Sequence, residues 1–135
     1  MSDFFEQSPY QARNFPQSLR FALKGIARGL RTQRNLRAHL LITLLVVALG
    51  CFLALDRWEW VSITFAIGLM WLAELLNTAI EWLVDVYTQH TYHELGGQIK
   101  DIAAGACLIV AGVCVLVGLL VFWPHLVGLL MPLAS

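Results

Sequence analysis

Four polar side chains stand at helical spacing inside a long apolar segment. Glu74, Asn77, Glu81 and Asp85 are separated by three, four and four residues. At ~100° per residue, these intervals place all four on one stripe of a helix, roughly 60° wide. A charged group near the centre of a bilayer costs at least ~2.5 kcal/mol, so such residues usually face a bundle interior or a wet cavity and indicate function. We call these four residues the acidic stripe and take it as the candidate site.

The acidic stripe offers two kinds of chemistry at two depths. Carboxylates at the water boundary suit a hard cation such as Mg²⁺, whose shell is completed by water and phosphate oxygens. A lysine beside them can pair with a nucleotide phosphate. A deeper carboxylate could accept a proton from a lipid hydroxyl at headgroup level. These features favour phosphoryl transfer from a cytosolic nucleotide to a membrane alcohol, but a proton or cation pathway and a structural polar seam use the same residue types.

The composition predicts a single membrane domain. Of 135 residues, 59% are hydrophobic and 13% are charged, and the mean hydropathy is +0.69. These values are typical of a membrane protein rather than of an aqueous core. The three cysteines lie in or beside apolar segments, so we expect packing residues and no disulfide framework. The chain has no GxxxxGK phosphate loop, which excludes the commonest soluble kinase design.

Three apolar segments have the roughly 20 residues that a membrane-spanning helix needs. The predicted spans cover about residues 36–55, 60–85 and 102–123, the last being stopped by Pro124. Residues 16–32 place apolar and basic side chains on different faces, which predicts a helix lying in the membrane surface rather than a solvated helix packed on the domain. The fold class is therefore an all-α membrane protein with three transmembrane helices plus an N-terminal amphipathic surface helix.

The ends of the chain and its basic residues complete the predicted organisation. Residues 1–14 show no periodic pattern and no apolar core of a cleavable signal peptide, so they are predicted to be a mobile N-terminus before one domain at 15–135. Seven of the nine Lys and Arg residues precede the uncharged run of residues 40–55, and only Arg57 lies in the turn after it. This distribution predicts a cytoplasmic N-terminus, with Lys100, Asp101 and the polar end of the acidic stripe on the cytoplasmic side.

The acidic stripe and the start of the third span resemble the prokaryotic diacylglycerol kinase and undecaprenol kinase family. The resemblance extends over about residues 17–125 and rests on Glu74-Leu-Leu-Asn-Thr-Ala-Ile-Glu81, Asp85, Lys100-Asp101-Ile-Ala-Ala-Gly-Ala and Arg34-Asn35…His39. It implies a small lipid kinase of the bacterial inner membrane that uses ATP and Mg²⁺ to phosphorylate a lipid alcohol. The resemblance also implies a homotrimer with sites shared between subunits, and no nucleic-acid partner is expected. The motifs are slightly closer to the undecaprenol branch than to the diacylglycerol branch.

The resemblance also implies roles for individual residues. Glu74 would be the general base, Asn77 would position it or the γ-phosphate, and Glu81 would be a metal ligand. The remaining roles are nucleotide binding by Asp85, Glu94, Lys100 and Asp101, and lipid contact by Lys24, Gly25 and His39.

Position 33 departs from the pattern of the family. The family usually has an acidic metal ligand in the segment before the first span, where this chain has Gln33. An amide still offers one oxygen to Mg²⁺ but gives up a full charge, so we expect weaker metal binding, lower activity or compensation by another group. The competing hypothesis is therefore a non-catalytic or weakly active membrane protein of the same fold, and a channel or proton carrier is the third.

Overall fold

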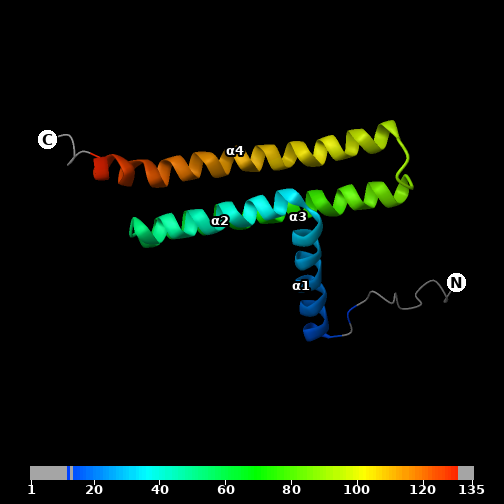
Figure 1. Cartoon of the computed structure of the whole chain (residues 1–135), viewed down its shortest axis with the longest axis horizontal. Coiled ribbons are helices and arrows are strands. Elements are labelled where there is room, and N and C mark those ends of the chain that lie inside the picture. The colour runs from blue at the N-terminus through cyan, green and yellow to red at the C-terminus, as the bar shows by residue number, and fades with distance from the viewer. Residues whose placement is uncertain (1–11, 13, 131–135) are drawn as a thin grey trace.

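The computed structural model describes residues 12 and 14–130, and within them every regular element is a helix. The mobile segment predicted for residues 1–14 lies almost entirely outside the described residues. The helices are α1 (Phe15–Thr32), α2 (Arg34–Phe52), α3 (Arg57–Tyr87) and α4 (Glu94–Leu130) (Figure 1). By length and composition, α2, α3 and α4 can each cross a membrane. The prediction of an all-α membrane protein is confirmed.

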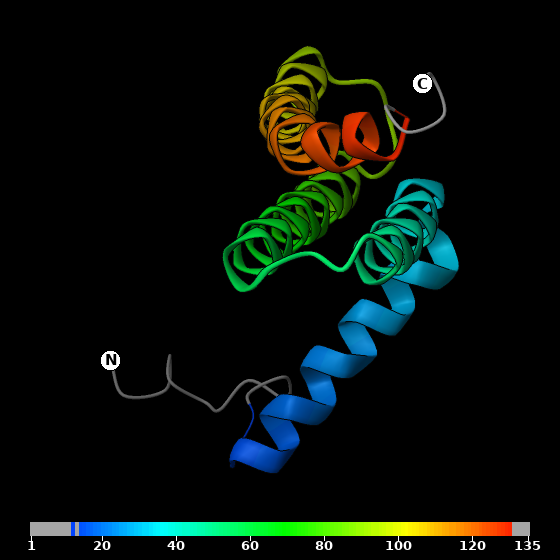
Figure 2. The same cartoon turned by 90° about the vertical axis from the view of Figure 1, so that its left-hand side faces the viewer.

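Helices α2, α3 and α4 run alongside one another, and α1 projects sideways from their bundle (Figures 1 and 2). Helix α3 packs closely along α4 and more lightly on α2. Large apolar side chains remain exposed along all three helices, for example Leu45, Phe65 and Leu108. An apolar surface of this extent suits contact with lipid or with other membrane helices.

The turn before α3 is held by a reciprocal cap, and we call this end of the bundle the tryptophan end because Trp58 and Trp60 lie there. The carboxylate of Asp56 accepts the backbone N–H groups of Trp58 and Glu59 at 2.7 and 2.9 Å, and Glu59 accepts the N–H of Asp56 at 2.8 Å. Glu59 also lies 2.8 Å from Nε2 of His125. This carboxylate therefore links the start of α3 to the last part of α4.

The predicted stop at Pro124 is wrong, because α4 continues through this residue to Leu130. A proline inside a helix removes one backbone hydrogen bond and costs ~3 kcal/mol. In apolar surroundings, ending the helix would leave several backbone groups unpaired, and each would cost as much. The contact between His125 and Glu59 also holds the helix on α3 just beyond the proline.

The end of α1 packs closely against α2 and α3. A Cβ atom on Gly29 would lie 2.7 Å from Cδ1 of Leu36 and 3.8 Å from Cδ2 of Leu75, so α1 ends close against both α2 and α3. The 31 residues of α3 extend ~46 Å, longer than the ~30 Å hydrocarbon core. If α1 lies in the membrane surface, the surface passes near Leu75, and the remainder of α3 extends into water. We call this extension, with the turn of residues 88–93, the charged end.

Candidate functional site

The acidic stripe begins at the level of α1 and continues toward the charged end. The side chains of Glu74 and Asn77 are buried, with 6% and 7% of their surfaces exposed. Glu81 and Asp85 are half-buried. The prediction that one face of α3 gathers these groups inside the protein therefore agrees with their burial.

Glu74 lies where three helices meet. Its Oε1 atom is 3.3 Å from Nε2 of His39 on α2, and the buried Cys107 of α4 lies against the same carboxylate. The resemblance implied a lipid contact for His39 and did not pair it with Glu74. The spacing of residues within α2 gave no signal for this contact, because it depends on how α2 packs against α3.

Asn77 presents a buried polar atom that has no partner. Its Nδ2 group donates to Oε1 of Glu81 at 3.0 Å. Its Oδ1 atom has no hydrogen-bond partner among the described residues. An unpaired buried acceptor costs about 1–3 kcal/mol. This oxygen is therefore available to a cation or to a hydroxyl donor that enters the site.

Asp85 and Lys100 form an ion pair across α3 and α4 at the charged end. Lys100 Nζ lies 2.5 Å from Asp85 Oδ1, and both side chains are about one-third exposed. They border a hollow of about 260 Å³ beneath the turn between the helices. Its other lining residues are Val84, Thr88, His90, Thr91, Tyr92, His93, Gly96 and Gly97.

Local backbone geometry creates this hollow. Gln89 and His90 adopt positive φ angles of 51° and 59°, which are uncommon for residues other than glycine. A Cβ atom on Gly96 would lie 3.1 Å from Val84, so a glycine there lets α4 begin close to α3. The first turn of a helix also presents free N–H groups that suit phosphate. Tyr92 and Gly96 line this hollow but were not among the predicted site residues. The adjacent glycines Gly96 and Gly97 were a signal in the sequence for a close helix start.

Several predicted site residues stand apart from these two clusters. Glu94 and Asp101 are exposed near the start of α4, and they are not among the residues that line the hollow. Lys24 and Gly25 are exposed on α1. Gln33 is half-buried between α1 and α2, and its side chain makes no capping hydrogen bond to α2.

The donor atoms on this chain fit a magnesium ion that is held largely by phosphate. Among the described residues, no group of three or more His, Cys, Asp or Glu side chains could hold a metal ion. Mg²⁺ commonly takes only one or two protein carboxylates and completes its shell with water and substrate phosphates. Glu81 and the unpaired Oδ1 atom of Asn77 supply such a partial set. Gln33 could add one amide oxygen.

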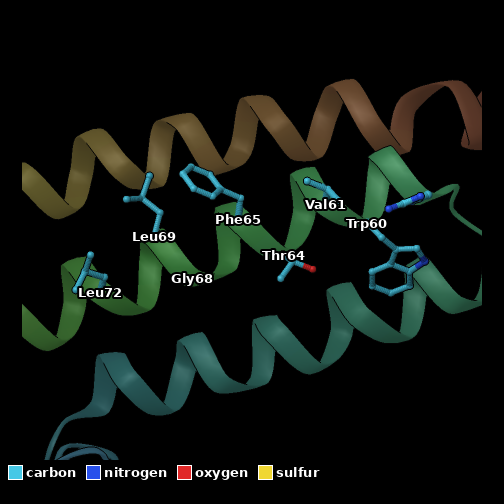
Figure 3. A pocket seen from close by; sticks show the side chains of 8 residues that line it. Trp60, Val61, Thr64, Phe65, Gly68, Leu69 and Leu72 are labelled. Atoms are coloured by element: carbon cyan, nitrogen blue, oxygen red, sulfur yellow. The ribbon is translucent and has the colours of Figure 1, made fainter.

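Two hollows lie toward the tryptophan end. A groove of about 870 Å³ follows the surface of α3 from Arg57 to Leu72 and contains no residue of the acidic stripe (Figure 3). A cavity of about 380 Å³ lies among α2, α3 and α4, and His39 is part of its lining. We call the second of these the interhelical cavity. Because His39 also contacts Glu74, the interhelical cavity extends to a side chain beside the acidic stripe.

Comparisons with known proteins place this geometry in a family context. The sequence profile described as "Prokaryotic diacylglycerol kinase" matches residues 20–122. The undecaprenol kinase of Bacillus subtilis (strain 168) is 39% identical over 116 residues, which cover 86% of this chain and 94% of that protein. The diacylglycerol kinase of Synechocystis sp. is 36% identical over 119 residues, covering 88% of this chain and 68% of that protein. The diacylglycerol kinase of Escherichia coli (strain K12) is 31% identical over 105 residues, which cover 78% of this chain and 85% of that protein.

Proposed function

The chain belongs to the prokaryotic diacylglycerol kinase family and is therefore a membrane lipid kinase, and we propose that it transfers the γ-phosphate of ATP to a lipid alcohol with Glu74 as general base. The observation that carries the proposal is the burial of Glu74 beside His39, at the level where the end of α1 lies against Leu75. At that depth, the carboxylate can meet a hydroxyl at the headgroup level of the bilayer. The exposed charged end lies on the same side of it.

The proton leaves the lipid hydroxyl by transfer to the Glu74 carboxylate. A general base acts within hydrogen-bond reach of the proton that it removes. Burial of Glu74 keeps bulk water from competing with the lipid hydroxyl as the phosphate acceptor. Nε2 of His39 lies 3.3 Å from Oε1 of Glu74, so the imidazole restricts the positions that this carboxylate can take.

The nucleotide binds at the charged end. Lys100 supplies a positive charge for the phosphates, and its ion pair with Asp85 keeps the ammonium group in place. The hollow beneath the turn has room for part of the nucleotide, and Tyr92 and Gly96 line it. Glu94 and Asp101, exposed on the adjacent start of α4, complete the nucleotide contacts.

Glu81 and Gln33 would hold Mg²⁺ together with the phosphates. The unpaired amide oxygen of Asn77 would be a further ligand for the ion. When bound, the ion would supply positive charge against the negative charge that develops during phosphoryl transfer. Asn77 itself fixes the Glu81 carboxylate by donating a hydrogen bond to it.

The membrane arrangement follows from the same assignment. Helix α1 lies in the cytoplasmic surface of the bacterial inner membrane, where Lys24 and Gly25 contact lipid headgroups, and the N-terminus is cytoplasmic. We infer that the protein assembles as a homotrimer, which would cover part of the exposed apolar surface of the three spans. The exposed basic and apolar side chains of α1 support the surface position.

Undecaprenol is slightly favoured as the substrate over diacylglycerol. The similarity to the undecaprenol kinase of Bacillus subtilis covers more of that protein, at higher identity, than the similarities to the two diacylglycerol kinases described above. The alternative is a weakly active or non-catalytic member of the family, which Gln33 favours because a neutral amide attracts a cation less than a carboxylate does.

A side-by-side assay tests the proposal. Purified protein in detergent micelles is given γ-labelled ATP, Mg²⁺ and either undecaprenol or diacylglycerol. We expect label in the lipid fraction with both alcohols and a higher kcat/KM with undecaprenol. No labelled lipid from either alcohol would contradict the kinase proposal for this chain, and ion flux through liposomes without ATP would then favour a carrier.

A further inference from the structure

The basic side chains of α1 gather on one face of the helix and have no acidic partner. Arg20, Lys24, Arg28 and Arg31 fall within an arc of ~80° at 100° per residue, and all four are exposed. None of them forms an ion pair with an acidic side chain among the described residues. Residues 7–55 contain no Asp or Glu, so the neighbouring sequence offers no compensating charge. We call these four residues the basic row.

The apolar face of α1 borders the basic row. Leu19 and Leu23 are 50% and 59% exposed, on a face centred roughly 130° from the basic row. A long basic side chain at such a border can lay its stem on apolar surface and keep its charge in water. A shallow hollow follows this border, and it is lined by Pro16, Leu19, Arg20, Leu23, Lys24 and Ala27. The border therefore suits a phospholipid, which presents a charged phosphate above its acyl chains.

Membrane orientation explains the number of basic residues here but not their arrangement. The excess of Lys and Arg beside a first span sets orientation through its count, and this rule requires no particular helix face. Contact with a charged surface does require one face. A zwitterionic headgroup and a lipid alcohol carry no net charge, whereas an anionic phospholipid attracts each nearby Lys or Arg. The charge of the basic row therefore favours anionic phospholipid.

Helix α1 ends against the helix that carries the candidate base. A Cβ atom on Gly29 would lie 2.7 Å from Cδ1 of Leu36 and 3.8 Å from Cδ2 of Leu75, and Leu75 directly follows Glu74. A single extended residue, Gln33, joins α1 to α2. An interaction that holds α1 on the membrane surface therefore acts on a helix end that packs beside Glu74.

We propose that the basic row binds anionic phospholipids of the leaflet in which α1 lies, and that this binding makes kinase activity rise with the anionic lipid content of the membrane. The second part rests on the proposed function, whereas the first part does not. Each Lys or Arg beside an anionic surface contributes about fivefold to association. The attraction weakens with salt, because the screening length falls from ~10 Å at 0.1 M to ~3 Å at 1 M.

A binding measurement without ATP tests the contact. Replacing the five tryptophans with phenylalanine and introducing Leu23→Trp leaves one indole at the hollow. The full chain is reconstituted in phosphatidylcholine vesicles that contain brominated phosphatidylglycerol or brominated phosphatidylcholine, whose bromine atoms quench indole fluorescence. We expect phosphatidylglycerol to associate about fivefold more strongly at ~0.1 M salt, and this preference to disappear near 1 M. Motional restriction of spin-labelled phosphatidylglycerol by the unmodified protein gives the same comparison without substitutions.

Two double variants separate charge from side-chain shape. Arg20→Gln with Arg28→Gln removes two charges of the basic row, and Arg20→Lys with Arg28→Lys keeps both. Neither residue belongs to the proposed catalytic, nucleotide or metal contacts. We expect the glutamine variant to lose the fivefold preference for phosphatidylglycerol and the lysine variant to retain it. Arg57→Gln, at the tryptophan end, should leave the preference unchanged.

Kinase activity tests the second part of the proposal. It is measured in phosphatidylcholine vesicles with increasing phosphatidylglycerol, at saturating ATP, Mg²⁺ and lipid alcohol. We expect kcat to rise several-fold in the unmodified protein and the lysine variant, and to stay flat in the glutamine variant.

The outcomes distinguish this proposal from the proposed function. Equal quenching by the two brominated lipids, or a preference that survives in the glutamine variant, would overturn the binding surface. A higher KM for ATP in the glutamine variant, with its lipid preference intact, would assign the basic row to the nucleotide instead. A lost preference without any change in kcat would overturn the link to activity. A preference for phosphatidylglycerol in a protein that phosphorylates no lipid would support the binding surface and contradict the kinase function.

Discussion

At the scale of single residues, the proposed chemistry depends most on Glu74 and Gln33. Glu74 is buried next to His39, so its carboxylate is screened from water but remains within reach of a second titratable group. Gln33 stands where the resemblance implies an acidic metal ligand, and Asn77 on the acidic stripe leaves its amide oxygen unpaired. Under the proposed function, this chain therefore keeps the general base but offers a weaker attraction to a metal ion.

Restoring a charge at position 33 should strengthen metal binding. We expect Gln33→Glu to lower the half-saturating Mg²⁺ concentration by about fivefold, because one charge at ~4 Å in water contributes ~1 kcal/mol. The measurement is kinase activity across a Mg²⁺ titration. Gln98→Glu adds the same charge at an exposed position of α4 and serves as the control. If both variants shift the titration equally, general electrostatics rather than direct ligation would explain the result.

At the scale of elements, the packing of α3 on α4 brings together Asp85 and Lys100, which we propose to contact the nucleotide. Their ion pair, Asp85 with Lys100, is about one-third exposed, so its contribution to folding is small. We expect the ion pair to act instead by holding the ammonium group of Lys100 beside the hollow at the charged end. Stability and nucleotide affinity should therefore respond differently to its removal.

Lys100→Met tests this separation. We expect the KM for ATP to rise by about tenfold or more, because a charge-assisted bond to phosphate is lost. The free energy of unfolding should fall by less than ~1 kcal/mol. Steady-state kinetics and thermal melting in micelles measure the two effects. Arg57→Met, at the tryptophan end, should leave the KM for ATP unchanged, and a loss of stability large enough to explain the lost activity would contradict the assignment.

The junction of α1 with the bundle should be sensitive to side-chain size at position 29. A larger residue there would collide with Leu36, whose Cδ1 atom lies 2.7 Å from the position of a Cβ atom. We expect Gly29→Val to destabilise the protein by about 1–3 kcal/mol, although valine favours a helix more than glycine does. Thermal melting measures this, with Ala27→Val at an exposed position of α1 as the control. Equal melting temperatures would show that α1 does not dock as the structure describes.

Local spacing explains which features of these elements were predictable. The acidic stripe follows from intervals of three and four residues, which a helix converts directly into one face. The contact of His39 with Glu74 and the interhelical cavity depend on the register between helices, which no single segment encodes. The end of α4 was misjudged because proline is a helix breaker in water, whereas an apolar environment penalises open backbone groups more.

The whole molecule places its candidate nucleotide site and its tryptophan end at opposite ends of α3 (Figure 1). A soluble nucleotide can reach the charged end only if that end faces the cytoplasm. The basic residues around α1 predict this orientation through the excess of positive charge before the first span. The proposed use of ATP therefore requires the charged end to lie on the cytoplasmic side of the membrane.

Cysteine labelling tests the orientation. In a variant with its three cysteines replaced by alanine, Tyr92→Cys and Trp58→Cys place single thiols at exposed positions of the charged end and the tryptophan end. We expect a membrane-impermeant maleimide to label Tyr92→Cys only in inside-out vesicles and Trp58→Cys only in right-side-out vesicles. The reverse pattern would place the charged end away from cytoplasmic ATP.

The role of Glu74 can be measured most directly by comparing the transfer of γ-labelled phosphate to undecaprenol by the unmodified protein and by Glu74→Gln. Glutamine keeps the shape of the side chain but cannot accept the proton. We predict that kcat falls by about 100-fold or more, as is usual when a general base is removed, while the melting temperature changes little. Full turnover by a correctly folded Glu74→Gln variant would contradict the account.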